Sequence, residues 1–264
     1  MTQNAISVKN LTAGYGRRIV LENISFDVPQ GQILTILGGS GCGKSTLLKH
    51  MIGLRTPFAG DILLHGKSIV SSTGNRKRAI MRRFGVAYQG GALFRSLSLA
   101  ENIALPMEEH TKMSREEIRE KVREKLRLVN LDGYQDYMPS DLSGGMVKRA
   151  AFARSLALDP DILFFDEPSA GLDPLSSASL DRLILNIREK PAATIVVVTH
   201  ELESIFTIAD RAVMLDANTK SIIADGPPLE LKKHSANSFV RLFLNAGRDP
   251  ADHSHEGGIH AGDK

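Results

Sequence analysis

The sequence contains no tryptophan and only one cysteine, Cys42, and aromatic residues make up 5% of its 264 positions. A single cysteine excludes an intrachain disulfide, and a chain of this length buries enough surface to fold without one. A lone thiol is typical of proteins in a reducing compartment. We therefore predict a folded protein that resides in the cytoplasm.

Long apolar runs are also missing. The longest, such as residues 33–37, 162–165 and 195–198, have the length of strands and fall far short of the ~20 residues that cross a bilayer as a helix. The first residues lack the charged and apolar segments of a secretory signal. We therefore predict that the chain neither crosses a membrane by itself nor carries a secretory signal.

Neither sign of charge is in clear excess. The chain has 33 Lys and Arg against 30 Asp and Glu, a formal charge of +3. That balance is too mild to predict a nucleic-acid partner without a localised basic face. Hydrophobic residues make up 42% and charged residues 24%, which is ordinary for a soluble globular protein.

The strongest motif is a glycine-rich loop at residues 38–45, which we call the phosphate loop. It reads Gly-Gly-Ser-Gly-Cys-Gly-Lys-Ser and fits the pattern G-x-x-x-x-G-K-[ST] between a predicted buried strand, residues 32–37, and a predicted helix. Bare N–H groups there can converge on phosphate oxygens, with Lys44 on the β- and γ-phosphates and the Ser45 hydroxyl on Mg²⁺. The alternative is a flexible turn before a surface lysine. The residues predicted here to bind ATP are Gly38, Gly39, Ser40, Gly41, Cys42, Gly43, Lys44, Ser45 and Thr46.

Two carboxylates end another predicted strand. The apolar residues 162–165 are followed by Asp166 and Glu167. Adjacent residues on a strand point to opposite sides, so we predict different roles for the two. Asp166 would orient Mg²⁺ through water, and Glu167 would activate the water that attacks the γ-phosphate. The alternative is a strand that ends in two solvated acids.

Two further polar residues are weaker signals. His200 follows a predicted strand, residues 194–199, at a position where ligands collect in sheets of this kind. We assign His200 to the γ-phosphate and the attacking water. Gln89 follows residues 85–88 and is assigned to Mg²⁺ or the same water. An ordinary loop histidine is the alternative for His200.

A second candidate phosphate surface lies far along the chain. Ser143, Gly144 and Gly145 precede a predicted helix, and together they offer a hydroxyl and uncovered N–H groups. The alternative is a simple helix cap with a tight turn.

The order of elements predicts an α/β fold. Strands alternate with helical stretches, which indicates a mostly parallel sheet. Residues 76–158 are predicted to be mostly helical, with a capping box at Ser114, and resemble an inserted subdomain. Residues 239–244 are predicted to pack on the core. The tail at residues 245–264 contains His253, His255 and His260 among glycines and is predicted to be disordered, with its histidines incidental rather than metal ligands.

Together these motifs resemble the ATP-binding subunit of an ABC transporter over residues 6–244. The matches are Tyr15 at the aromatic that stacks on adenine, residues 38–45 at Walker A, Gln89 at the Q-loop, residues 142–146 at the signature segment, residues 162–167 at Walker B with its catalytic glutamate, residues 170–173 at the D-loop and His200 at the switch histidine. The resemblance implies a P-loop NTPase with a RecA-like, mostly parallel sheet, an antiparallel N-terminal β region and a helical subdomain at about residues 90–160. It also implies one ATPase domain over residues 1–244.

Within that family, residues 88–94 and 142–151 resemble the phospholipid-trafficking ATPases of the MlaF and Mce-associated group. Met146 departs from the general family pattern, which has glutamine there, so the usual polar side chain is missing.

The resemblance implies a head-to-tail pair of identical chains, with each Mg-ATP held between Walker A of one and the signature of the other. It implies membrane permease subunits, an Mce-type lipid-binding protein and a small accessory subunit as further partners, with no nucleic acid. The expected location is peripheral, on the cytoplasmic face of the inner membrane. ATP hydrolysis would then energise movement of phospholipid or another hydrophobic substrate.

Two alternatives remain open. A soluble ABC-type ATPase that acts on nucleic acid or ribosomes would commonly carry a coiled-coil insertion or a second ATPase domain, and this sequence shows neither. A P-loop kinase or GTPase would leave the signature segment at residues 142–146 unexplained.

Overall fold

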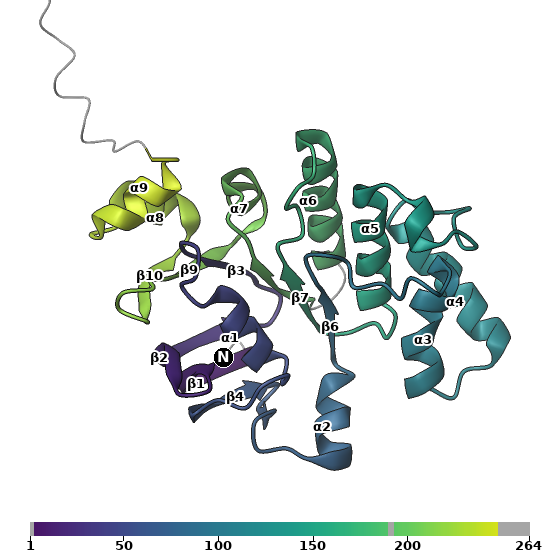
Figure 1. Cartoon of the computed structure of the whole chain (residues 1–264), viewed down its shortest axis with the longest axis horizontal. Helices are drawn as coiled ribbons and strands as arrows, with labels where there is room; N and C mark the ends of the chain where they lie inside the picture. Colours follow the sequence, from purple (N-terminus) through teal and green to yellow (C-terminus); the bar gives the residue numbers. More distant parts are fainter. Residues whose placement is uncertain (1–2, 190–192, 248–264) are drawn as a thin grey trace, which may run out of the picture.

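The computed structural model describes residues 3–189 and 193–247 of the chain. Its larger sheet has six strands in the order β10-β9-β3-β8-β7-β6 (Figure 1). The pairs β6–β7, β7–β8, β8–β3 and β3–β9 are parallel, and β10 runs antiparallel along β9. The predicted parallel-rich sheet is thereby confirmed. Its strands are β3 (Ile33–Leu37), β6 (Phe84–Ala87), β7 (Ile162–Asp166), β8 (Thr194–Val198), β9 (Arg211–Leu215) and β10 (Ile222–Gly226).

The smaller sheet is the predicted antiparallel N-terminal region. Its order is β2-β1-β4-β5, and every pairing in it is antiparallel. A tight hairpin joins β1 to β2, with Tyr15 paired to Arg18 at its end. This hairpin brings Tyr15 close to the start of the first helix. The strands are β1 (Asn4–Tyr15), β2 (Arg18–Pro29), β4 (Ala59–Leu64) and β5 (Lys67–Ser68).

The central strands β3, β8 and β7 of the larger sheet are nearly continuous apolar runs because both faces of the sheet are covered there. Phe164 of β7 packs in a core with the smaller sheet and α1 (Lys44–Met51), whereas Leu163 and Phe165 face a second core made largely by helices. Phe165 stacks on Phe152 of α5 (Gly144–Ser155), with ring centroids 4.1 Å apart. Alternate residues of each strand therefore enter different cores, which explains the continuous runs.

Most of the remaining helices come between β6 and β7 in the sequence, or after β7. The capping box predicted at Ser114 is present, with Glu117 as its partner. The prediction that residues 76–158 are mostly helical misses β6, a four-residue strand that is too short to show an alternation. The other helices are α2 (Gly74–Met81), α3 (Leu99–His110), α4 (Arg115–Leu128), the 3₁₀ turn η1 (Pro139–Asp141), α6 (Pro174–Arg188), α7 (Leu202–Ile208), α8 (Pro228–His234) and α9 (Ser238–Leu244).

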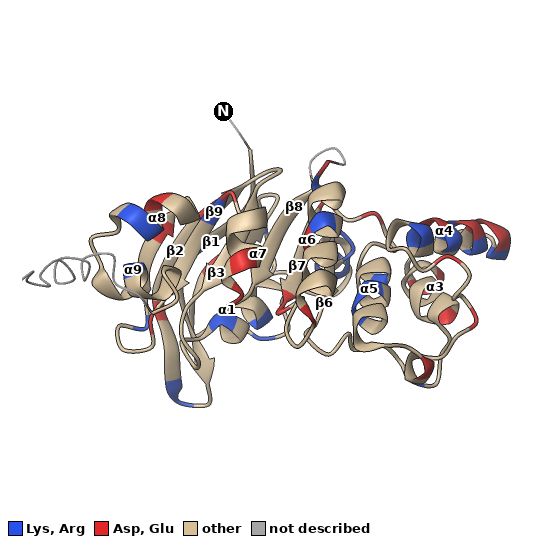
Figure 2. Ribbon diagram, turned by 90° about the horizontal axis from the view of Figure 1, so that it is seen from above, with Lys and Arg blue, Asp and Glu red and all other residues tan. Residues whose placement is uncertain are grey.

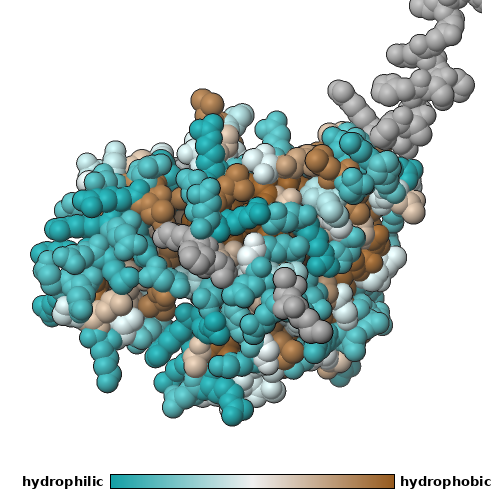
Figure 3. Space-filling model, turned by 180° about the vertical axis from the view of Figure 1, so that it is seen from behind, coloured by the Kyte–Doolittle hydropathy of each residue, from teal (hydrophilic) through white to brown (hydrophobic). Residues whose placement is uncertain are grey.

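The surface is predominantly polar. Figure 2 shows acidic and basic residues along α4, whose apolar positions Ile118, Val122 and Leu126 are buried. On the face seen in Figure 3, apolar side chains are interspersed with hydrophilic ones. Within the described ranges, no helix combines the length and apolarity that a bilayer span requires.

The chain's last described helix packs on the core, as predicted. Val240 and Leu244 of α9 are buried against Ala212 and Met214 of β9. The tail predicted from residue 245 falls mainly outside the described residues, which end at residue 247. His253, His255 and His260 all lie outside them.

A fully buried lysine connects α4 to the segment before β7. Lys125 Nζ donates to the carboxylates of Asp159 and Glu124, and Lys121 Nζ donates to Asp159 Oδ2 at 2.9 Å. Burial raises the pKa of Asp159, but the hydrogen bonds from the two lysines outweigh that effect and hold its pKa below the ordinary value. The contact fixes α4 relative to the segment that leads into β7, the strand that ends at Asp166.

We expect Asp159→Asn to lower the free energy of unfolding by about 1–3 kcal/mol at neutral pH, because Lys125 loses its anionic partner while Asn tolerates the φ of 49° at this position. A carboxylate with a lowered folded-state pKa stabilises the fold above its unfolded pKa of about 3.9, and this contribution is lost as the pH falls through the folded pKa. Urea unfolding of the wild type and the variant should therefore converge below pH 4. Asp132→Asn, at an exposed ion pair, is the control. A difference that stays constant down to pH 2 would contradict the assignment.

Candidate functional site

The phosphate loop connects β3 to α1, as predicted. Gly38, Gly41 and Gly43 have φ values of 140°, 76° and 106°, in the region that favours glycine. A Cβ on Gly38 would lie 2.4 Å from the Leu215 carbonyl oxygen, and one on Gly43 would lie 2.7 Å from Leu21 Cδ2. Both the backbone angles and the available space therefore require glycine at residues 38 and 43.

A cavity of about 420 Å³ lies over this loop. Lys44 Nζ donates to the carbonyl oxygens of Gly38 and Gly39, at 2.7 and 3.1 Å. Ser45 is exposed, so its hydroxyl is available to a ligand. The cavity is lined by Tyr15, Arg18, Val20, Gly41, Gly43, Lys44, Ser45 and Thr46.

The single cysteine, Cys42, is a residue of this loop. Its side chain is buried, and burial raises the pKa of the Cys42 thiol. A thiol with a raised pKa is a poor nucleophile at neutral pH. Cys42 therefore contributes a small, buried and unreactive side chain to the loop.

Two contacts fix the ring of Tyr15 at the edge of the cavity. Thr46 Oγ1 donates to the Tyr15 hydroxyl oxygen at 3.1 Å, and the Arg55 guanidinium lies over the ring, 4.4 Å from its centroid. Tyr15 as a whole is 36% exposed. The sequence analysis did not single out Arg55, because nothing in the local pattern indicates that this cation reaches the hairpin.

The two acidic residues at the end of β7 lie close together. β7 ends at Asp166, and Glu167 has a φ of 48°. The prediction that the two alternate along a strand is therefore wrong, because the backbone leaves the strand at Glu167. Burial and the charge of Glu167 raise the pKa of Asp166. Asp166 Oδ1 is buried and has no hydrogen-bond partner among the described residues, whereas the buried Glu167 Oε2 lies 2.9 Å from His200 Nδ1.

The unpartnered Asp166 Oδ1 fits a divalent cation. Carboxylate and hydroxyl oxygens are the ligands that Mg²⁺ prefers, and a positive ion reverses the desolvation and repulsion that raise the pKa of Asp166. The exposed Ser45 lies in the first turn of α1, which packs against β7 and β8.

His200 meets Glu167 directly. Its Nδ1 lies 2.9 Å from Glu167 Oε1, and its ring is exposed whereas Glu167 is largely buried. The contact arises because β7 and β8 are parallel neighbours, so both chains leave the sheet at the same edge. Gln89 is exposed just beyond β6, the strand on the other side of β7.

The signature segment lies elsewhere. Ser143 caps α5, and its Oγ accepts a hydrogen bond from the Met146 N–H at 3.3 Å. Figures 1 and 2 both show α5 well separated from α1 and the phosphate loop. The structure therefore brings the phosphate loop, Asp166, Glu167 and His200 together, but leaves Ser143, Gly144 and Gly145 apart from them.

One lysine, missed by the sequence analysis, links α5 to the other site residues. Lys148 Nζ donates to the carbonyl oxygen of Ala170, in the turn that follows Glu167. Burial lowers the pKa of Lys148, while the charges of Glu167 and Glu201 oppose that shift. The sequence around Lys148 does not indicate this role, because its partner Ala170 is 22 residues away and is brought near only by folding.

Comparison with known proteins places these features in a family. The profile of the ABC transporter family matches residues 21–170, more than half of the chain. The intermembrane phospholipid transport system ATP-binding protein MlaF of Haemophilus influenzae is 42% identical over 249 residues, which cover 94% of this chain and 93% of that protein. The probable ribonucleotide transport ATP-binding protein mkl of Mycobacterium leprae is 43% identical over 244 residues, 92% of this chain and 70% of that protein.

A solved structure supports the same assignment. The dimeric ATP-binding cassette MJ0796, in a post-hydrolysis state bound to ADP and Pi, superposes with a TM-score of 0.76 at 28% identity, covering 84% of this chain and 98% of that one. The family profile spans the phosphate loop, the signature segment and the acidic end of β7. With these segments matched and the similarity to MlaF extending over nearly the full length of both proteins, this chain belongs to the ABC transporter family and is one of its ATPase subunits.

Proposed function

We propose that two copies of this chain bind and hydrolyse Mg-ATP at a shared interface and so energise the transport of phospholipid. The observation that carries the proposal is the separation of Ser143 from the phosphate loop within one chain. The phosphate surface at Ser143 cannot reach a nucleotide bound by the phosphate loop of the same chain. It can, however, contact a nucleotide bound by the phosphate loop of another copy. The dimer of MJ0796, bound to ADP and Pi, supports this arrangement.

In this proposal the loop N–H groups and the N-terminus of α1 bind the phosphates of ATP. Adenine stacks on Tyr15, and Lys44 exchanges the carbonyl oxygens of Gly38 and Gly39 for phosphate oxygens. The partner's signature helix adds its hydroxyl and N–H groups to the γ-phosphate. ATP thus favours closure of the pair, because it supplies the anion that both surfaces bind.

Mg²⁺ would be held by Ser45, with Asp166 as a ligand through water and Gln89 nearby, and when bound it would neutralise charge on the phosphates. Glu167, whose carboxylate contacts His200, accepts a proton from the attacking water. His200 holds the Glu167 carboxylate through Nδ1 and faces solvent, where the γ-phosphate would lie.

The transport role is proposed from the named relatives. MlaF, an ATP-binding protein of phospholipid transport, matches over 93% of its own length, whereas mkl, named for ribonucleotide transport, matches over 70%. We infer that permease subunits, an Mce-type lipid-binding protein and a small accessory subunit complete the complex, with this chain on the cytoplasmic face of the inner membrane. The mild net charge does not favour nucleic acid as a partner.

Glu167→Gln tests the general base. We expect ATP binding to persist while hydrolysis falls by about 10²–10⁴-fold, because the amide accepts no proton. The trapped nucleotide should hold the chain as a dimer in size-exclusion chromatography with light scattering. Glu230→Gln, on the exposed face of α8, is the matched control and should turn over normally. Unchanged phosphate release by Glu167→Gln would remove this residue from the role.

Mixing two inactive variants tests the shared site. Lys44→Ala retains an intact signature segment, and Ser143→Arg retains an intact phosphate loop, so a mixed pair assembles one complete site. We expect activity in an equal mixture to recover to about a quarter of the wild-type value if chains pair at random. Each variant alone should be inactive. No recovery at any mixing ratio, with wild type active, would contradict the shared site.

Co-purification tests the substrate class. The full complex, extracted in detergent and analysed by mass spectrometry, should carry a permease and bound phospholipid. Recovery of nucleic acid without a permease would favour the alternative of a soluble ATPase.

A further inference from the structure

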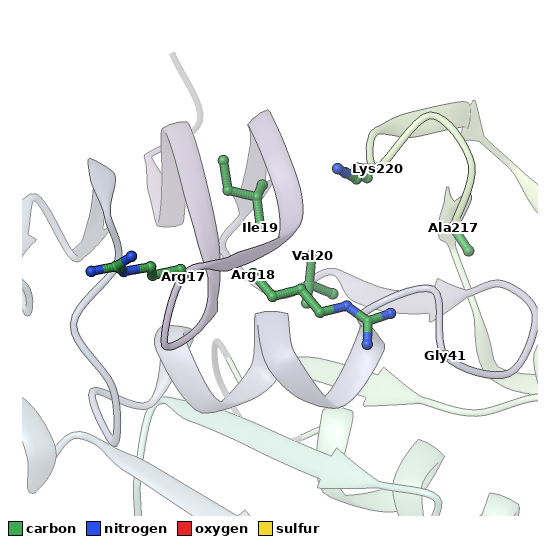
Figure 4. Close-up of a pocket in the computed structure, with 7 residues that line it drawn as sticks. All are labelled: Arg17, Arg18, Ile19, Val20, Gly41, Ala217 and Lys220. Atoms are coloured by element: carbon green, nitrogen blue, oxygen red, sulfur yellow. The ribbon is translucent and has the colours of Figure 1, made fainter.

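A second cavity adjoins the one above the phosphate loop. It has a volume of about 410 Å³ and lies between the β1–β2 hairpin, the phosphate loop and the turn that joins β9 to β10 (Figure 4). Arg18, Val20 and Gly41 line both cavities, so the two are direct neighbours. The residues that line the second cavity are Arg17, Arg18, Ile19, Val20, Gly41, Ala217 and Lys220.

The charged groups of this cavity are all cations. Figure 4 shows the Arg18 side chain extending toward Gly41 and Lys220 on the opposite wall, whereas Arg17 points away from both. Among the described residues, no side chain or carbonyl group forms a hydrogen bond or ion pair with the cationic groups of Arg18 and Lys220. Two unpaired cations therefore face a cavity with no carboxylate in its lining.

The backbone holds Lys220 in place. The Glu22 N–H donates to the Lys220 carbonyl oxygen at 2.8 Å, which attaches the turn to β2. Within the turn, Asp216 Oδ2 accepts hydrogen bonds from the N–H groups of Asn218 and Thr219, at 3.1 and 2.8 Å. Lys220 has a φ of 54°, a conformation that a lysine seldom adopts. The turn thus keeps a strained residue with a long cationic side chain over the cavity.

We propose that this cavity binds a phosphate group between Arg18 and Lys220, beside the nucleotide. Two cations on opposite walls match a dianion, and the exposed loop at Gly41 provides a third polar side. The phosphate is either free inorganic phosphate or a phosphate carried on the ribose of the nucleotide, since both present the same oxygens. The inference rests on the proposed function only in placing ATP in the adjoining cavity.

The test compares two variants that each remove one cation. Lys220→Asn removes a charge that faces the cavity and suits the positive φ, and Arg17→Gln removes the neighbouring charge that points away. Both are made in the full-length Glu167→Gln chain with saturating Mg-ATP, so that the phosphate positions of the loop are filled. Binding of radiolabelled inorganic phosphate is then measured by equilibrium dialysis. We expect Lys220→Asn to bind about tenfold more weakly than Arg17→Gln.

A second arm measures the affinity of each variant for an adenosine triphosphate with an added 3′-phosphate, relative to ATP. If Lys220→Asn weakens binding only of inorganic phosphate, in the first arm, the ligand is free phosphate. If it weakens binding only of the 3′-phosphorylated nucleotide, in the second arm, the ligand is a phosphate on the nucleotide. Equal affinities of Lys220→Asn and Arg17→Gln in both arms, or no binding in either, would overturn the proposal. If Mg-ATP itself does not bind, the proposed function fails, and phosphate dialysis of the two variants in a Lys44→Ala chain still decides the cavity.

Discussion

Parallel pairing of β3, β8 and β7 is the constraint on which the site depends. Val198 of β8 pairs with Ile36 of β3 on one side and with Asp166 of β7 on the other, so all three strands end at the same edge. The phosphate loop, the acidic pair and His200 each follow the end of one of these strands. Residues separated by more than 150 positions therefore meet, and loops with different chemistry share one small space.

The same architecture separates the two phosphate surfaces. The phosphate loop starts a helix on the face toward the smaller sheet, whereas Ser143 starts α5 on the opposite, helical face. Lys148 donates a hydrogen bond from α5 to the turn after Glu167, so α5 and this turn are in direct contact through this side chain. In a head-to-tail pair, this contact would connect two nucleotides: the one bound by the chain's own phosphate loop, and the one in the partner that the chain's signature segment contacts.

Much of the fold and of the candidate site could be predicted from the sequence, because the patterns that define them lie within short, continuous segments. The buried strands show as apolar runs, the phosphate loop has an unambiguous spacing, and the capping box at Ser114 is complete within four residues. The predicted α/β class and its ABC-family resemblance were confirmed.

The features that sequence reasoning missed arise from tertiary contacts or backbone geometry. The left-handed backbone at Glu167 replaced the expected alternation, since nothing local distinguishes a strand that ends one residue earlier. β6 has only four residues, so no alternating pattern reveals it inside a region predicted to be helical. Arg55, Lys125 and Lys148 act through partners distant in sequence, so each becomes visible only once the chain is folded.

The central claim is that the reaction needs two chains, and activity per chain as a function of concentration tests it most directly. Hydrolysis at saturating Mg-ATP is measured over a dilution series whose mass distribution is followed by sedimentation. The account predicts that activity per chain falls in proportion to the dimer fraction and vanishes for the monomer. Activity per chain that stays constant at dilutions where every chain is monomeric would contradict it.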